Sequence, residues 1–221
     1  HNGILTIKGK GTLEVVFESV FMEEGQTENP ENAGVVSRNI ISSRGISLTR
    51  MWYPSIEGMA FYNLRAFLPE GFLAVSEAES VNISKSAQGS EYVFSFPHPV
   101  NGITFTAGKY REVKDRYNGI EIFGYFFPED LRLAKTYLEH TRKYLKMYQE
   151  LLAPYPYRRF SVVENFLPTG YSMPTFTLIG QEIVRLPFIV ETSLGHEILH
   201  QWFGNSVYVD TKRGNWSEGL T

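Results

Sequence analysis

The sequence predicts a chain of two parts, an antiparallel β-sandwich over residues 1–127 and a mixed α and β part over residues 128–221. Two observations lead to this fold class. Up to about residue 127, short alternating segments are separated by clusters of Gly, Pro, Asn and Ser, which is typical of antiparallel strands. After residue 127, a long helical pattern begins, and segments with strand and helix patterns follow it. We therefore expect two domains with a boundary between residues 127 and 128.

Six segments of the first part are predicted to be strands, at residues 5–8, 13–17, 46–52, 61–67, 92–96 and 103–107. A hairpin signal lies further along the chain, where Asn118-Gly119 separates Val113 from the apolar residues 120–123. Both central positions of a two-residue hairpin turn need positive φ, which Asn and Gly adopt most easily. The pair therefore predicts a tight turn between two strands.

The second part opens with Pro128-Glu129-Asp130, which is a typical helix start. Proline suits the first helical position, and acidic side chains are favourable near the positive end of the helix dipole. The face predicted to be buried repeats at spacings of three and four and comprises Ala134, Leu138, Thr141, Leu145, Tyr148 and Leu152. Pro154 and Pro156 are expected to end this helix, because proline breaks the helical hydrogen-bond pattern.

Three further elements are predicted after the long helix. Residues 160–164 and 176–180 read as strands, and residues 187–203 as a second helix. Gly204-Asn205 provides a good C-terminal cap for that helix.

The composition excludes several classes of protein. With 43% hydrophobic and 20% charged residues the chain is an ordinary globular protein, and no apolar run approaches the roughly 20 residues of a membrane span. The 21 basic and 24 acidic residues are scattered and give a net charge of −3, which argues against nucleic acid as a partner. The absence of cysteine excludes disulfides, thiolate nucleophiles and cysteine-ligated metal sites.

The most informative segment is Gly195-His196-Glu197-Ile198-Leu199-His200. On a helix, His196 and His200 share one face and can present two imidazole nitrogens to one tetrahedral cation. Glu197 lies beside that face, where it can reach a metal-bound water without binding the metal. This arrangement is typical of metal-assisted hydrolysis, in which the ion activates water and polarises a carbonyl while the carboxylate moves protons.

A catalytic zinc ion needs a third protein ligand and an open fourth position. A metzincin would place histidine at position 206 and glycine at 203, but the sequence has Ser206 and Phe203. Glu218, within Asn215-Trp216-Ser217-Glu218-Gly219, is the remaining candidate for the third ligand.

Residues 196–205 and 215–219 together resemble the zinc signature of the gluzincin aminopeptidases, the family of aminopeptidase N and leukotriene hydrolase. The Phe-Pro-Glu-Asp helix start, the Pro-Tyr-Pro turn at 154–156 and the segment 68–76 are also similar, so the resemblance covers essentially the whole chain. It implies a saddle-like β-sandwich domain followed by the start of a thermolysin-like α+β catalytic domain. It also implies one zinc ion held by His196, His200 and Glu218, with Glu197 as the general base.

The resemblance implies a zinc-dependent metallopeptidase of the aminopeptidase type that hydrolyses peptide substrates. One departure concerns the third ligand, since seventeen residues separate His200 from Glu218 where the family usually has eighteen. A one-residue deletion in the loop after Val209 would absorb the difference, so the ligand assignment stands as a prediction.

A second departure concerns substrate binding. The family holds the free amino terminus of its substrate with a Gly-x-Met-Glu-Asn segment before a strand, and the matching segment is Gly170-Tyr171-Ser172-Met173-Pro174-Thr175. Pro174 stands where the amine-binding carboxylate is expected. Glu164, which we expect at an exposed strand end, and Glu182 are candidate substitutes. We also expect an extended peptide to pair beside the strand at 176–180.

Two alternatives remain at this stage. Pro174 favours an endopeptidase or another zinc hydrolase on the same scaffold, and a non-catalytic peptide-binding module is the third reading. The resemblance further implies that the helix bearing Glu218 and an oxyanion-stabilising tyrosine continue beyond residue 221. We therefore expect these 221 residues to be the first part of a larger enzyme, with little activity and weak zinc binding of their own.

Overall fold

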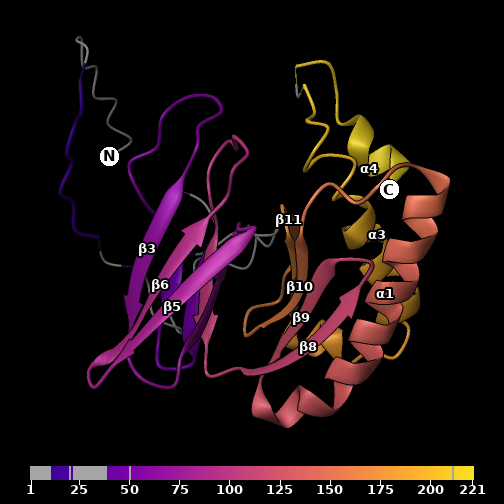
Figure 1. The fold of residues 1–221 in the computed structure, drawn as a ribbon, viewed down its shortest axis with the longest axis horizontal. Coiled ribbons are helices and arrows are strands. Elements are labelled where there is room, and N and C mark those ends of the chain that lie inside the picture. The colour runs from indigo at the N-terminus through magenta and orange to yellow at the C-terminus, as the bar shows by residue number, and fades with distance from the viewer. Residues whose placement is uncertain (1–10, 20, 22–38, 50, 211) are drawn as a thin grey trace, which may run out of the picture.

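The computed structural model describes residues 11–19, 21, 39–49, 51–210 and 212–221. The strand predicted at residues 5–8 lies outside these residues. Strands outnumber helices in the described parts, and they form three sheets (Figure 1). Most strand pairs are antiparallel, as the sequence predicts for the first part of the chain.

Two antiparallel sheets occupy the first part of the chain. The four-stranded sheet has the order β1 (Ile40–Ile41), β2 (Gly45–Leu48), β7 (Phe105–Gly108) and β4 (Leu73–Ser76). The three-stranded sheet has the order β3 (Asn63–Leu68), β6 (Gly89–Ser95) and β5 (Ser80–Ser86). Both sheets contribute to one hydrophobic core, which includes Leu48, Leu68, Ala74, Tyr92, Phe94 and Phe105. Two antiparallel sheets that share a core are compatible with the predicted sandwich.

The predicted strands of the first part agree with the structure in most places. The segments at 61–67, 92–96 and 103–107 overlap β3, β6 and β7. The segment at 46–52 is shorter than expected, because β2 ends at Leu48. The strand predicted at 13–17 is wrong, since residues 11–19 form no strand and Val16 is 90% exposed. No strand of the described residues pairs with this segment, and the alternating pattern alone does not make a strand there.

A five-stranded mixed sheet forms the second half of the structure. Its order is β11 (Gly170–Met173), β12 (Phe176–Gly180), β10 (Arg159–Asn165), β9 (Ile120–Phe126) and β8 (Arg111–Tyr117). β10 is parallel to β9 and β12, and the remaining pairs are antiparallel. Asn118 and Gly119 join β8 to β9 with φ of 47° and 85°, which confirms the predicted turn. Because β9 pairs with β10, a boundary between residues 127 and 128 would cut through this sheet.

The long helix connects β9 to β10. It begins as a 3-10 helix, η2 (Pro128–Leu133), and continues as α1 (Ala134–Leu151), so the predicted helix is confirmed apart from its first six residues. Its buried face comprises Ala134, Tyr137, Leu138, Thr141, Tyr144 and Leu145, which includes four members of the predicted stripe. Leu152 lies beyond the last helical residue and is 45% exposed.

The helix predicted at residues 187–203 is interrupted. The structure has η3 (Ile189–Glu191) and α3 (Ser193–Leu199), separated by Thr192, whose φ of −124° and ψ of −88° are not helical. After α3, the backbone N–H groups of Gln201 and Trp202 bond to carbonyls only three residues earlier. The apolar periodicity continues through these tighter turns, which is why the sequence pattern suggests one longer helix.

α1 and α3 cover the side of the five-stranded sheet that faces away from β3, β5 and β6 (Figure 1). Gly195 allows α3 to lie close to α1, because a Cβ atom at this position would be 2.7 Å from Tyr144 Cε1. Tyr148 supports the same contact by donating its hydroxyl hydrogen to the Gly195 carbonyl at 3.2 Å. This packing fixes the position of α3, which carries the central motif of the sequence.

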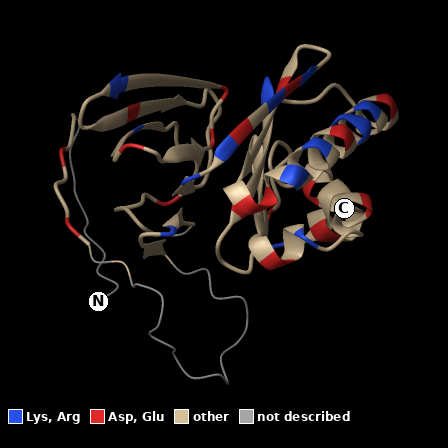
Figure 2. Cartoon of the chain, turned by 90° about the horizontal axis from the view of Figure 1, so that it is seen from below, with Lys and Arg blue, Asp and Glu red and all other residues tan. Residues whose placement is uncertain are grey.

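Charged residues of both signs are mixed throughout the chain, and Figure 2 shows no segment in which basic residues alone are gathered. Among the helices of the described residues, none has the length and apolar character that crossing a membrane requires. Two short helices complete the fold, α2 (Gln181–Val184) and α4 (Trp216–Leu220).

Candidate metal centre

Three side chains predicted as metal ligands meet between α3 and α4. His196 lies in the last turn of α3, and His200 is the first residue after that helix. Their Nε2 atoms are 3.2 Å apart, because the His200 N–H still bonds to the His196 carbonyl and keeps the helical spacing. Glu218 on α4 places Oε2 at 3.5 Å from His196 Nε2 and Oε1 at 3.4 Å from His200 Nε2.

These separations fit a single tetrahedral ion. Donor atoms about 2.0–2.1 Å from one zinc ion, at tetrahedral angles, are about 3.3 Å from one another. The three measured separations fall between 3.2 and 3.5 Å. Two imidazoles and a carboxylate also suit other divalent transition metals, so this group of side chains could hold such an ion but does not select zinc.

The orientation of His200 suits metal binding. Its Nδ1 lies 3.0 Å from the Phe203 carbonyl oxygen, which can only accept a hydrogen bond. We therefore assign the proton to Nδ1, which leaves the lone pair of Nε2 directed at the other two ligands. His200 is only 8% exposed, so this orientation is held by its surroundings.

Glu197 belongs to the same cavity without joining the ligand group. This cavity of about 340 Å³ is lined by the three ligands, Glu197 and residues of β11. A Cβ atom at Gly170 would lie 3.9 Å from Glu197 Oε1, so the carboxylate reaches toward β11. Burial raises the pKa of Glu197 above its ordinary value, an effect that the two histidines oppose and Glu218 reinforces. A carboxylate with a raised pKa is a stronger proton acceptor, which suits a general base.

Ser172 of β11 ties this strand to the metal centre. Its hydroxyl donates to the Glu197 carbonyl at 2.8 Å and accepts from Gln201 Nε2 at 2.9 Å and Asn205 Nδ2 at 3.0 Å. Gln201 is fully buried, and it also donates to the Met173 carbonyl at 2.9 Å and accepts from the Thr175 N–H at 2.8 Å. One glutamine beside a candidate metal ligand thus holds β11 and the turn that leads into β12.

The predicted substrate-binding segment is divided between two cavities. Gly170, Tyr171 and Ser172 line the metal cavity. Ser172, Met173 and Pro174 line a neighbouring cavity of about 510 Å³, which also shares Gly204 and Asn205 with the metal cavity. Pro174 therefore lies beside the metal centre and does not face the three ligands.

Thr175 completes the turn after Pro174 and lines neither cavity. Its φ of 74° is uncommon for a β-branched residue, and three hydrogen bonds hold it in this conformation. Its N–H donates to Gln201 Oε1, its hydroxyl accepts from the Ala78 N–H at 3.2 Å, and its carbonyl accepts from the Ser161 N–H at 2.9 Å. Thr175 is therefore a structural residue of the turn, and the expectation that it binds substrate gains no support from its position.

The structure corrects the expectation for Glu164. This side chain is fully buried in β10 rather than exposed at a strand end, and Oε2 accepts a hydrogen bond from the Phe127 N–H at 2.7 Å. Burial, together with the nearby Asp130 carboxylate, raises its pKa from 4.5 to about 8. The carboxylate does not line the metal cavity, and neither does the exposed Glu182. Neither residue therefore supplies a carboxylate to this cavity.

The expected place of an added peptide strand also changes. β12 is paired on one side with β10 and on the other with β11, so no peptide can pair beside residues 176–180. Among the described strands of this sheet, β11 is the edge that borders the metal cavity. An extended ligand would therefore pair with β11.

Sequence reasoning singled out the three candidate ligands, which the structure brings together, and Glu197, but it missed Gln201. Its signal was a polar residue directly between His200 and the apolar pair Trp202-Phe203, which indicates a buried hydrogen-bonding role. Residues of the first part of the chain that line the neighbouring cavity, such as Glu77 and Tyr53, gave no sequence signal. In comparisons with known proteins, no family model and no curated protein matches the chain.

Proposed function

We propose that this chain belongs to a zinc-dependent metallopeptidase of the aminopeptidase type. The observation that carries the proposal is the spacing of 3.2–3.5 Å among His196, His200 and Glu218, with the Glu197 carboxylate in the same cavity. Two histidines and a glutamate with an adjacent, non-ligating glutamate form the donor set of a hydrolytic zinc centre.

The proposal extends to the division of the chain into two domains. We propose that the two antiparallel sheets form the saddle-like sandwich domain, and that the mixed sheet with α1 and α3 is the thermolysin-like α+β catalytic domain. Under this division, β8 and β9 belong to the catalytic domain because they share its sheet. The proposed boundary then falls between β7 and β8.

In the proposed reaction, a peptide lies extended along β11 with its carbonyl beside the histidines. A zinc ion bound there would lower the pKa of a water molecule and polarise the carbonyl. Glu197 takes a proton from the attacking water at its carboxylate oxygen and gives it to the nitrogen of the leaving amine. The N–H and C=O groups at the free edge of β11 would hold the substrate backbone.

The substitution Glu197→Gln tests this proposal. General base catalysis contributes about 10²–10⁴-fold, so we expect peptide hydrolysis to fall by at least that factor. We expect zinc content to stay at one ion per chain, because Glu197 is not a ligand. The measurements are peptide turnover by the natural protein that contains these residues and metal analysis after dialysis. An active Glu197→Gln protein would refute the role of Glu197.

A second variant, His200→Ala, tests the metal centre itself. It removes the most buried of the three ligands and should abolish stoichiometric zinc binding together with turnover. A wild-type protein that binds no divalent metal would refute the proposed centre itself.

One observation favours a second candidate, an endopeptidase on the same scaffold. Pro174 carries no charge, and the residues of β11 that line the metal cavity offer no carboxylate for a substrate ammonium. Comparing hydrolysis of free and N-acetylated peptides separates the two activities, because an aminopeptidase fails on the acetylated series and an endopeptidase cleaves it.

A further inference from the structure

The cavity next to the metal centre joins the two parts of the chain. Its volume is about 510 Å³, and it shares Ser172, Gly204 and Asn205 with the metal cavity. Residues of the first part of the chain also line it, including Tyr53 and Glu77. A substrate held beside the histidines would extend directly into this space.

Glu77 is the only charged residue among the described residues that line this cavity. It is 5% exposed, and its carboxylate accepts hydrogen bonds from the Thr104 N–H at 2.8 and 3.0 Å and from the Ser76 hydroxyl at 3.1 Å. No cationic side chain of the described residues forms an ion pair with it. A buried carboxylate without a counter-charge is costly, so a cation that enters this cavity would be bound favourably.

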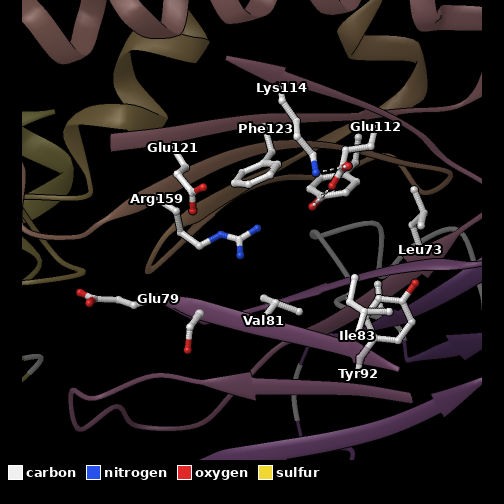
Figure 3. Close-up of a pocket in the computed structure, with 13 residues that line it drawn as sticks. Leu73, Glu79, Val81, Ile83, Tyr92, Glu112, Lys114, Glu121, Phe123 and Arg159 are labelled. Atoms are coloured by element: carbon white, nitrogen blue, oxygen red, sulfur yellow. Dashed lines mark hydrogen bonds and ion pairs between the residues drawn. The ribbon is translucent and has the colours of Figure 1, made fainter. Parts of the chain in front are cut away.

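The cavity in Figure 3 shows the opposite case. There Glu112 pairs with Lys114 at 2.9 Å and Glu79 pairs with Arg158 at 3.5 Å. Arg159, which is 8% exposed and lies 4.3 Å from the centre of the Phe123 ring, points into the cavity. The acidic groups of that cavity therefore have basic neighbours of their own. The Glu77 cavity differs because, among the described residues, its single charge has no basic neighbour.

We propose that the Glu77 cavity binds a positively charged group of the substrate, an ammonium or a guanidinium, while the substrate carbonyl lies at the metal centre. The location of that carbonyl rests on the proposed function. The rings of Tyr53 and Tyr62 line the same cavity and are favourable neighbours for a cation. Glu77 thus selects cationic substrates from a position close to Pro174 in the same cavity.

Peptide binding tests this proposal without requiring turnover. The protein is the natural chain that carries these residues, loaded with zinc, in a Glu197→Gln background so that peptides stay intact. The probes are Ala-Ala-Ala with a free amine, N-acetyl-Ala-Ala-Ala, N-acetyl-Lys-Ala-Ala and N-acetyl-Met-Ala-Ala, measured by calorimetry at pH 7.5. A preference for free over acetylated Ala-Ala-Ala identifies the terminal ammonium as the ligand, and a preference for the lysine over the methionine peptide identifies a basic side chain.

We expect one of these preferences to be about tenfold or larger, the usual size for a charge-assisted hydrogen bond. Glu77→Gln, which keeps the shape of the side chain, should reduce the preference to less than about twofold. Glu121→Gln, the same change at an exposed carboxylate of the Figure 3 cavity, should leave it unchanged. A preference that survives Glu77→Gln overturns the proposal.

If Glu77→Gln does not fold, the wild-type ligand series decides alone. Equal affinity for the cationic and neutral peptides overturns the proposal, and a clear preference for either cation supports it. The outcome is separable from that of the proposed function. If the wild type hydrolyses peptides but shows no preference for cationic peptides, only the proposed role of Glu77 is refuted. If a Glu77-dependent preference is found without hydrolysis, only the proposed peptidase activity is refuted.

Discussion

Replacing Gln201 with leucine should destabilise the protein by breaking the link between the metal centre and the β11–β12 hairpin. The glutamine is fully buried and makes hydrogen bonds to Ser172, Met173 and Thr175 at 2.8–2.9 Å. Leucine has a similar volume, so the substitution removes the polar contacts while leaving little cavity.

The magnitude follows from the groups that lose their partners. The Thr175 N–H is buried and would have no acceptor, which costs about 1–3 kcal/mol. The Met173 carbonyl would lose a donor, whereas the Ser172 hydroxyl would still accept from Asn205. We therefore expect a loss of about 2–4 kcal/mol in the free energy of unfolding. For a chain of this size, that lowers the melting temperature by roughly 5–15 °C.

Urea denaturation followed by circular dichroism measures this loss, with Gln88→Leu as the control. Gln88 is exposed, so its substitution should change the free energy of unfolding by less than about 0.5 kcal/mol. A Gln201→Leu protein within 1 kcal/mol of the wild type would show that the buried hydrogen bonds do not hold the hairpin, and the reasoning would be refuted.

Three further predictions concern packing, pH and metal. Gly195→Ala should cost about 1–3 kcal/mol in urea denaturation, because its Cβ would lie 2.7 Å from Tyr144 Cε1; an unchanged stability would contradict this close contact. Burial raises the pKa of Glu77 from 4.5 to about 7. The folded wild type therefore holds the proton of the Glu77 carboxyl more tightly than the unfolded chain does, and it loses stability as pH rises from 4.5 to 7. The free energy of unfolding of Glu77→Gln, taken relative to that of the wild type, should therefore increase by about 3 kcal/mol between pH 4.5 and 7. A difference that does not change with pH would contradict the raised pKa of Glu77. Zinc at about 100 times its dissociation constant should stabilise the wild type by about 2.7 kcal/mol in thermal unfolding but leave His200→Ala unaffected, and equal stabilisation of both would place the ion elsewhere.

The proximity of the two candidate histidine ligands was predictable because it depends on local spacing. His196 and His200 are one helical turn apart, and this relation survives although α3 ends before His200. Glu218 was found by elimination and by resemblance, and the structure brings its carboxylate to both histidines. The Asn118-Gly119 turn was predictable for the same reason, since the turn depends on the backbone preferences of two adjacent residues.

The features that could not be predicted from the sequence depend on contacts between distant segments of the chain. Glu164 was expected to be exposed because it ends a strand pattern, but its strand lies in the middle of the sheet and its carboxylate caps the Phe127 N–H. Glu77 and Pro174 line one cavity next to the hydrogen bond from Ala78 to Thr175, which joins segments 97 residues apart. The strand predicted at 13–17 has the right alternation but no pairing partner among the described residues. A single sequence does not specify these long-range pairings.

The pairing of β9 with β10 limits how this protein can be shortened. A piece that starts at Pro128 would lack β8 and β9, and the bare backbone edge of β10 would be open to pairing with other molecules. Its buried strand residues, such as Phe160 and Val162, would then meet water, and such a piece should precipitate. A piece able to fold by itself must begin upstream of Arg111, so that the first strand of the mixed sheet is retained.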